Sequence, residues 1–344
     1  MNLISKIALS LLFATITCCA KAQDTNAGDM VKQGVELQNQ GKYAEAIEKY
    51  KEALKADPEN TQANYQMGFS LFASGKGMDG VPFVEKAIKN GATPSFTASA
   101  YDLLGSIYDQ ANQSDKSIDA YKSGIKVNPN YQRLHFNLGI AYSRYKKYAE
   151  AEQEAIEAIK LDPKHASSQR LYALVTFHQN KRLNALLAFC SFIALEPNTP
   201  RSTEAYTNIQ SILKGGTLKD AVGRNTIIIS PKDKQDDAVN NMVISVTASV
   251  AQKTKLTGVD LLGYELQHIF SIAGQSSKDK TDKTFFEQFF VVYFYKLAQS
   301  DNMQAFAHMV DAAANKEANE KWATENAQQV TALSEWLQKA ERGF

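Results

Sequence analysis

Apolar residues recur at helical spacing along residues 27–214, and prolines divide this pattern into units of similar length. The polar–proline pairs are Asp57-Pro58, Asn128-Pro129, Asp162-Pro163 and Glu196-Pro197, and the last three pairs follow one another at a constant spacing. The gap between the first two pairs is slightly more than twice that spacing, and Thr93-Pro94 lies near the place of a missing proline. Because proline lacks an N–H group and disfavours helical geometry in the preceding residue, each pair predicts the end of a helix.

Small residues recur in register with these prolines. The first column is Gly34, Gly68, Gly105, Gly139 and Ala173, and two further columns are Ala46, Gly80, Ser117, Ala151 and Ala185, and Ala53, Ala87, Gly124, Ala158 and Phe192. Two antiparallel helices approach closely only where small side chains face each other, and larger residues at i±3 and i±4 fill the space beside the crossing. The pattern therefore predicts a row of helical hairpins.

These columns, Tyr108 and Tyr142 in the first helices, and the closing prolines resemble the tetratricopeptide repeat family. The resemblance implies repeats at about 27–60, 61–97, 98–131, 132–165 and 166–199, with 202–214 as a following or capping helix. The second repeat matches worst, because it has Gly80 in place of alanine and no closing proline in register. The expected fold is all-α: an α-solenoid of tetratricopeptide-like helical hairpins over 27–214, followed by a smaller helical C-terminal domain.

The last third of the chain shows helical periodicity without a family resemblance. Gly215-Gly216 interrupts the pattern and the run 227–231 is apolar and extended, so 215–232 is assigned as a linker and 233–344 as the C-terminal domain. The periodicity predicts helices at 233–253, 259–273, 283–299, 302–314 and 319–340. The very apolar segment 285–295 is interpreted as a helix buried on several sides; an interfacial membrane helix and a dimer seam are the alternatives.

The N-terminus has the features of a secretory signal peptide, expected at residues 1–22. Lys6 precedes an apolar run from Ile7 to Cys19, and Ala20-Lys21-Ala22 places small residues where a signal peptidase reads. Such a run is too short to span a bilayer of about 30 Å as a helix. The chain is thus expected to be exported to the periplasm or cell envelope, with cleavage near Ala22; an N-terminal membrane anchor is the alternative. Cleavage would remove Cys18 and Cys19. The remaining cysteine, Cys190, lies in an apolar run and is interpreted as a buried small hydrophobic residue.

Composition and motifs argue against several classes of function. Lys and Arg number 38 against 37 for Asp and Glu, so no global charge predicts nucleic acid binding, and membrane contact is expected to be at most peripheral. The G-x-G-x-x-G run 75–80 follows a predicted helix, where a dinucleotide site needs a strand. No two histidines have metal-site spacing on one helix, and His308 and Asp311, one turn apart, are interpreted as a surface hydrogen-bonding pair. We therefore predict no catalytic residues, no cofactor and no metal.

The remaining candidate surface is the concave face that the family resemblance implies, lined by the first helix of each repeat. Its expected partner-binding residues are Tyr65, Phe69, Asp102, Asp109, Arg133, Asn137, Arg144, Arg170 and His178. A groove of this kind holds a protein or peptide through aromatic anchors and Arg–carboxylate pairs; a merely solvated face is the alternative. The function predicted is a non-catalytic protein-binding scaffold of the cell envelope. An enzyme with a site in 216–344, or self-assembly through 285–295, are the alternatives, and the oligomeric state is left open.

Overall fold

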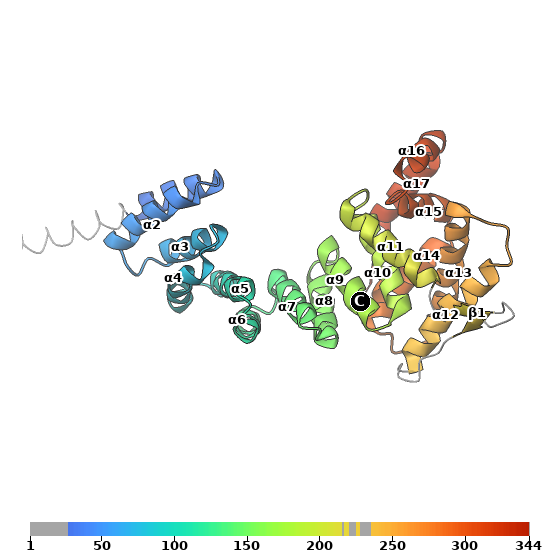
Figure 1. Ribbon diagram of the computed structural model, residues 1–344, viewed down its shortest axis with the longest axis horizontal. Helices are drawn as coiled ribbons and strands as arrows, with labels where there is room; N and C mark the ends of the chain where they lie inside the picture. The colour runs from blue at the N-terminus through green and yellow to red at the C-terminus, as the bar shows by residue number, and fades with distance from the viewer. Residues whose placement is uncertain (1–26, 215–216, 220–224, 228–234, 344) are drawn as a thin grey trace, which may run out of the picture. The chain divides into compact units, whose positions relative to one another are not determined.

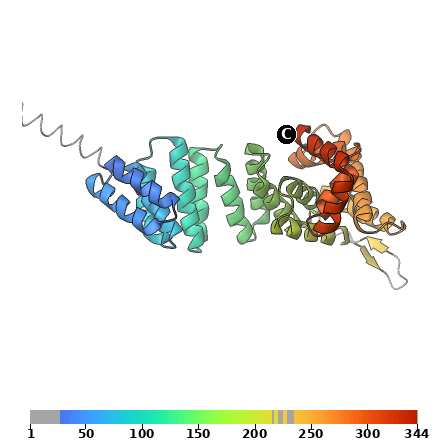
Figure 2. The same ribbon diagram turned by 90° about the horizontal axis from the view of Figure 1, so that it is seen from above.

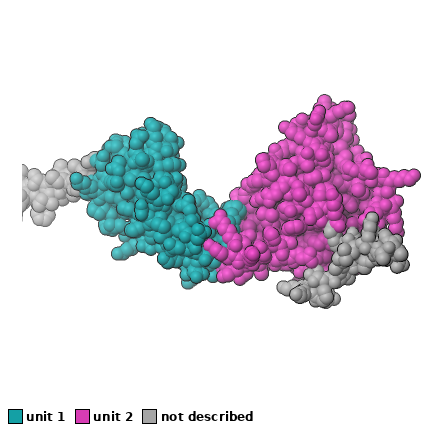
Figure 3. All heavy atoms as spheres, viewed as in Figure 1, with its two compact units in different colours: residues 1–141 teal, residues 142–344 magenta. Residues whose placement is uncertain are grey.

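The structure is a computed structural model that describes residues 27–214, 217–219, 225–227 and 235–343. The expected signal peptide and most of the expected linker lie outside these residues. The described chain is all-α apart from one small β-hairpin, and it divides into two compact units, residues 1–141 and 142–344 (Figure 3). No helix in the described ranges is both long enough and apolar enough to cross a membrane.

Unit 1 consists of helices that pack in consecutive pairs (Figure 1). After a helix described over 27–39 come α2 (Tyr43–Ala56), α3 (Thr61–Ala73), α4 (Gly77–Lys89), α5 (Pro94–Gln110), α6 (Ser114–Val127) and α7 (Gln132–Arg144), whose last three residues belong to unit 2. Each hairpin turn contains one residue in the left-handed region: Gly41 (φ 75°), Gly75 (φ 80°) and Asn112 (φ 56°). Lys146 and Asn180 hold the corresponding places in unit 2. The backbone therefore repeats with the period of the prolines, lengthened slightly between Gly75 and Asn112.

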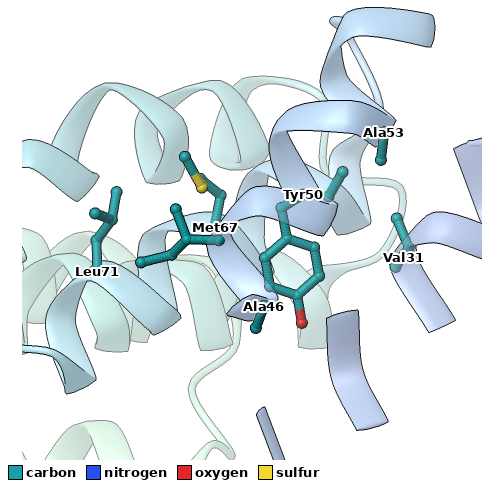
Figure 4. Packing of buried hydrophobic residues seen from close by; sticks show 8 residues of the cluster. Val31, Ala46, Tyr50, Ala53, Met67 and Leu71 are labelled. Carbon is teal, nitrogen blue, oxygen red and sulfur yellow. The ribbon is translucent and has the colours of Figure 1, made fainter. Parts of the chain in front are cut away.

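The small-residue columns lie where helices cross. A Cβ atom on Gly34 would stand 2.4 Å from the Tyr50 ring, and one on Gly68 would stand 2.3 Å from Val84. Tyr50 is fully buried in a cluster with Val31, Ala46 and Met67 (Figure 4), and its hydroxyl donates to Gln38 Oε1 at 3.1 Å. Glycine on one helix thus allows the two helices to approach closely, and a larger side chain on the partner helix fills the space.

Thr93-Pro94, which lies near the place of the missing closing proline, begins a helix instead of ending one. Pro94 is the first residue of α5, and the Thr93 hydroxyl caps the helix by accepting the Phe96 N–H at 3.2 Å. Proline is tolerated at this position because its missing N–H would have no partner in the first turn. α5 is therefore 17 residues long and begins four residues before the repeat boundary expected at 98.

Unit 2 continues the hairpins and adds the C-terminal helices. Its elements are α8 (Tyr148–Leu161), α9 (Ala166–His178), α10 (Arg182–Leu195), α11 (Pro200–Lys214), strands β1 (Thr217–Lys219) and β2 (Asn225–Ile227), α12 (Gln235–Ala251), α13 (Gly258–Lys278), the π-helical turn η1 (Glu287–Val291), α14 (Val292–Ala298), α15 (Met303–Asp311), α16 (Lys316–Glu325) and α17 (Ala327–Lys339). The two strands pair antiparallel, with Thr217 opposite Ile227. The described parts of the expected linker are therefore two short strands that pair their backbone groups with each other.

Helix α10 is the core of this unit. Twelve of its fourteen residues are buried, and it contacts α9, α11, α12, α15 and η1. The helices of residues 235–343, orange to red in Figure 2, lie next to the green-to-yellow helices that precede them. Arg182, at the start of α10, donates from Nη2 to the Ile212 carbonyl at 2.6 Å and from Nη1 to Ser245 Oγ at 3.2 Å. Residues 142–214 are thereby grouped with the C-terminal helices; the domain boundaries drawn from the sequence stay a prediction.

Two features of the C-terminal helices test what the sequence predicted for 319–340 and 285–295. The predicted helix 319–340 is wrong, because the chain breaks at Asn326 (φ −121°, ψ 37°) into α16 and α17. The apolar segment 285–295 is interior, with Phe289, Phe290 and Phe294 fully buried and Tyr172 stacked on Phe290 at 5.3 Å. These three rings are therefore not available as a seam for a second copy.

Candidate functional site

The first helices of unit 1 bring several of the predicted partner-binding residues together. Tyr65 and Phe69 on α3 are half-buried and pack against the core cluster formed by α5, Val84 and Ala120. Asp102 on α5 and Arg133 and Asn137 on α7 form a polar group beside Tyr65. Asp109, two turns further along α5, is half-buried.

Asp102 holds Arg133 in place. Its carboxylate is completely buried; one oxygen lies 2.6 Å from Arg133 Nε in an ion pair, and the other accepts the Asn137 amide at 2.7 Å. The Arg133 side chain is 60% exposed, so its Nε end is held against the protein while the rest of the side chain reaches solvent. Among the described residues Arg133 has no other ion pair, which leaves both Nη groups for an external acceptor.

The surroundings of Asp102 are poorly hydrated. Burial raises the pKa of Asp102 above its ordinary value, although Arg133 and Asn137 act in the opposite direction. Burial also raises the pKa of the Tyr65 hydroxyl. Charge-assisted hydrogen bonds are stronger where water is excluded, so this surface suits an acidic ligand group placed against Arg133.

Aromatic side chains complete the group, and two of them were missed by the sequence analysis. The Phe96 ring lies 5.4 Å from the Tyr65 ring at an angle of 58°, and a hydrogen bond of 2.9 Å joins the hydroxyls of Tyr131 and Ser99. Phe96 was missed because the third repeat was expected to begin at residue 98, whereas α5 begins at Pro94. The signal that could have found it is Thr93, whose side chain is a good N-cap. We call Tyr65, Phe96, Asp102, Arg133 and Asn137 the aromatic–arginine group.

In unit 2, the predicted residues take part in contacts within and between successive repeats. Arg170 on α9 forms an ion pair with Glu204 on α11, and Arg201 donates to Ser167 at 2.9 Å; the two members of each pair occupy equivalent places in successive repeats. His178 is exposed and stacks on Tyr148 at 4.8 Å, and Arg144 is exposed. α11 thus follows α9 in the register of a further repeat.

The residues considered as candidates for nucleotide binding, nucleophilic or metal chemistry lie in a helical turn or in the core. Gly75 forms the turn between α3 and α4, with helix on both sides, and Cys190 is fully buried, which raises the pKa of its thiol. His308 and Asp311 were expected to pair at the surface, and this is wrong: both are buried, and Asn319 bridges them. Within the ranges that the structure covers, no three His, Cys, Asp or Glu side chains group as a metal site requires.

Comparison with known proteins agrees with the hairpin architecture. The family described as TPR repeat matches residues 36–75 and 105–144, and the family described as tetratricopeptide repeat matches 132–165. Tetratricopeptide repeat protein 6 of Homo sapiens is 25% identical over 132 residues, which is 38% of this chain and 25% of that protein. Hsp70-Hsp90 organizing protein 1 of Glycine max is 31% identical over 108 residues, 31% of this chain and 18% of that protein.

The chain therefore spans about a quarter or less of the length of these two relatives. The crystal structure of YrrB, a TPR protein with an unusual peptide-binding site, aligns with 55% of this chain and 97% of its own at 19% identity and a TM-score of 0.45. Tetratricopeptide repeats are a protein-interaction fold, in which stacked hairpins provide an extended binding surface. The chain contains tetratricopeptide repeats, at residues 36–75 and 105–165.

Proposed function

We propose that this protein is a non-catalytic scaffold of the cell envelope that binds a protein or peptide partner on the first helices of its repeats. The observation that supports this most directly is the aromatic–arginine group. There, a buried aspartate orients a largely exposed arginine beside two half-buried rings. Arginine and aromatic side chains are the residues most enriched at energetically important positions of protein interfaces.

The chemistry of this group favours a partner segment with an acidic side chain. The two Nη groups of Arg133 form a planar fork that matches a carboxylate, and the edge of the Tyr65–Phe96 pair offers apolar area to a neighbouring side chain. The partner segment is therefore expected to carry an Asp or Glu next to an apolar or aromatic residue. Nothing in the composition favours nucleic acid, since the positive and negative charges balance.

The test is affinity capture from an extract of the cell envelope, read by mass spectrometry. Arg133→Glu should abolish capture of the specific partner, and Arg133→Gln with Tyr65→Ala should weaken it by about tenfold or more. Lys126→Glu, an exposed change on the second helix α6, is the matched control and should leave capture intact. Equal capture by all variants would contradict a role for this surface.

Export is proposed from the N-terminal sequence, and it has a separate test. Cell fractionation should find the protein in the envelope, and sequencing of its N-terminus should begin at Gln23. A cytoplasmic protein that retains Met1 would contradict export without affecting the binding proposal.

A further inference from the structure

Two pockets of unit 2 share part of their lining. One, of about 370 Å³, lies between the α10–α11 connection and helices α15, α16 and α17. The other, of about 610 Å³, lies between the α8–α9 turn, the end of α10, α14 and the chain after α17. Ala194, Ser334 and Leu337 line both, so the two pockets meet along α17.

The smaller pocket is apolar in character. Trp322, Val330 and Leu333 line it, and its buried polar groups are already bonded to each other. The Asn319 amide nitrogen donates to Asp311 Oδ2 at 2.7 Å and to the Asn315 carbonyl at 2.8 Å. Its Oδ1 therefore accepts from His308 Nδ1 at 2.7 Å, and the His308 ring stacks on Trp322 at 3.7 Å.

The larger pocket contains two cations that have no acidic partner among the described residues. The Arg342 guanidinium donates to Ser191 Oγ and, at 3.4 Å, to Gln169 Oε1, both neutral groups, and lies over the Tyr293 ring at 4.0 Å. Lys164 is exposed at the rim of the same pocket. Glu341 also lines this pocket and is exposed, so the charges of these three side chains sum to +1.

We propose that the joined pockets bind a fatty acid, with the alkyl chain against Trp322 and Leu333 and the carboxylate at Arg342 and Lys164. Arg342 is half-buried and has no acidic partner among the described residues, and a carboxylate offers the planar bidentate acceptor that an arginine fork prefers. The volumes fall in the range of small-molecule sites. An alkyl chain fits this lining better than a peptide, whose backbone groups need partners that His308 and Asn319 already provide to each other.

The test uses the full chain with Trp336→Phe, so that Trp322, in the apolar pocket, is the fluorescent reporter. Laurate, below its aggregation concentration, should change the Trp322 emission and bind about tenfold more tightly than dodecanol, which has the same chain without the charge. Lys164→Gln combined with Arg342→Gln should abolish that preference and leave dodecanol binding unchanged. Glu341→Gln should tighten laurate binding about two- to threefold by removing a like charge.

Lys321→Gln, an exposed lysine of α16 outside both pockets, is the control and should bind laurate as the parent does. Lys164→Gln alone changes an exposed side chain, so it should weaken laurate binding while the urea unfolding midpoint stays that of the parent. Absence of laurate binding, or equal affinity for laurate and dodecanol, would overturn the proposal. So would a peptide ending in apolar residues that displaces laurate at lower concentration, because the pocket would then belong to a chain terminus.

Discussion

Gly105 and Tyr121 lie in direct contact across the α5–α6 hairpin. A Cβ atom on Gly105 would stand 2.4 Å from Cε1 of Tyr121, closer than two carbon atoms can approach. The same relationship, at the same separation along the chain, joins Gly34 to Tyr50 and Gly68 to Val84. In successive repeats, a side chain of the second helix thus fills the space that glycine leaves on the first helix.

Gly105→Ala should therefore destabilise unit 1. The added methyl group must displace a Tyr121 ring that is only 2% exposed, and overpacking of this kind costs about 1–3 kcal/mol. Urea unfolding followed by circular dichroism measures this change. Gly28→Ala is the control, since a Cβ there meets nothing within 4 Å, and it should be neutral or slightly stabilising. Equal effects at the two sites would show that the close contact has no energetic importance.

Arg133 and Asp102 should behave as a coupled pair. Arg133→Gln leaves the buried Asp102 carboxylate with Asn137 but without its cation, and should lower the free energy of unfolding by about 1 kcal/mol at pH 7, given the exposure of Arg133. The double variant with Asp102→Asn should cost less than the sum of the single changes. The loss should also shrink in acid, because Asp102 becomes protonated there. Additive effects would mean that the pair is not coupled.

Arg182 should link the last hairpin to the C-terminal helices. Arg182→Leu leaves the Ile212 carbonyl and Ser245 without their donor inside the protein, which costs about 2–4 kcal/mol. Hydrogen exchange should become faster in α11 and α12 as well as in α10. Arg201→Gln, at a half-exposed ion pair with Glu196, should cost less than about 1 kcal/mol. Unchanged exchange in α12 would show that this helix is stable without α10.

Glu265 should make stability depend on pH. Burial raises its pKa from 4.5 to about 7, although Lys214 acts in the opposite direction. Between pH 4.5 and about 7, the folded state therefore keeps a proton on Glu265 that the unfolded state has lost. This contribution to stability is complete below pH 4.5 and is lost as the pH rises through 7.

Glu265→Gln should remove that dependence. The variant should match the parent near pH 4 and exceed its unfolding free energy by about 1–2 kcal/mol at pH 8. The comparison of parent and variant by urea unfolding at both values isolates Glu265 from all other titrating groups. A difference that is the same at pH 4 and pH 8 would contradict the assignment.

The hairpins could be predicted from the sequence because the contacts that form them are local. Gly34 and Tyr50, or Gly68 and Val84, meet within one repeat, so their spacing is visible as columns in the chain. The aromatic–arginine group was predicted only in part. Phe96 was missed because the third repeat was expected to begin at residue 98, whereas α5 begins at Pro94 with Thr93 as its N-cap, and proline is tolerated in the first turn of a helix.

The sequence alone determined the repeat period, the helical class and the residues at the helix crossings, because each depends on spacing within one repeat or between neighbouring repeats. Only the tertiary structure decided which helices surround α10, how Asn319 joins His308 to Asp311, and where Arg342 lies. Arg182 meets Ser245 across 63 positions and Arg342 meets Ser191 across 151. No periodic pattern records such pairs, because packing between distant segments chooses them through shape and burial.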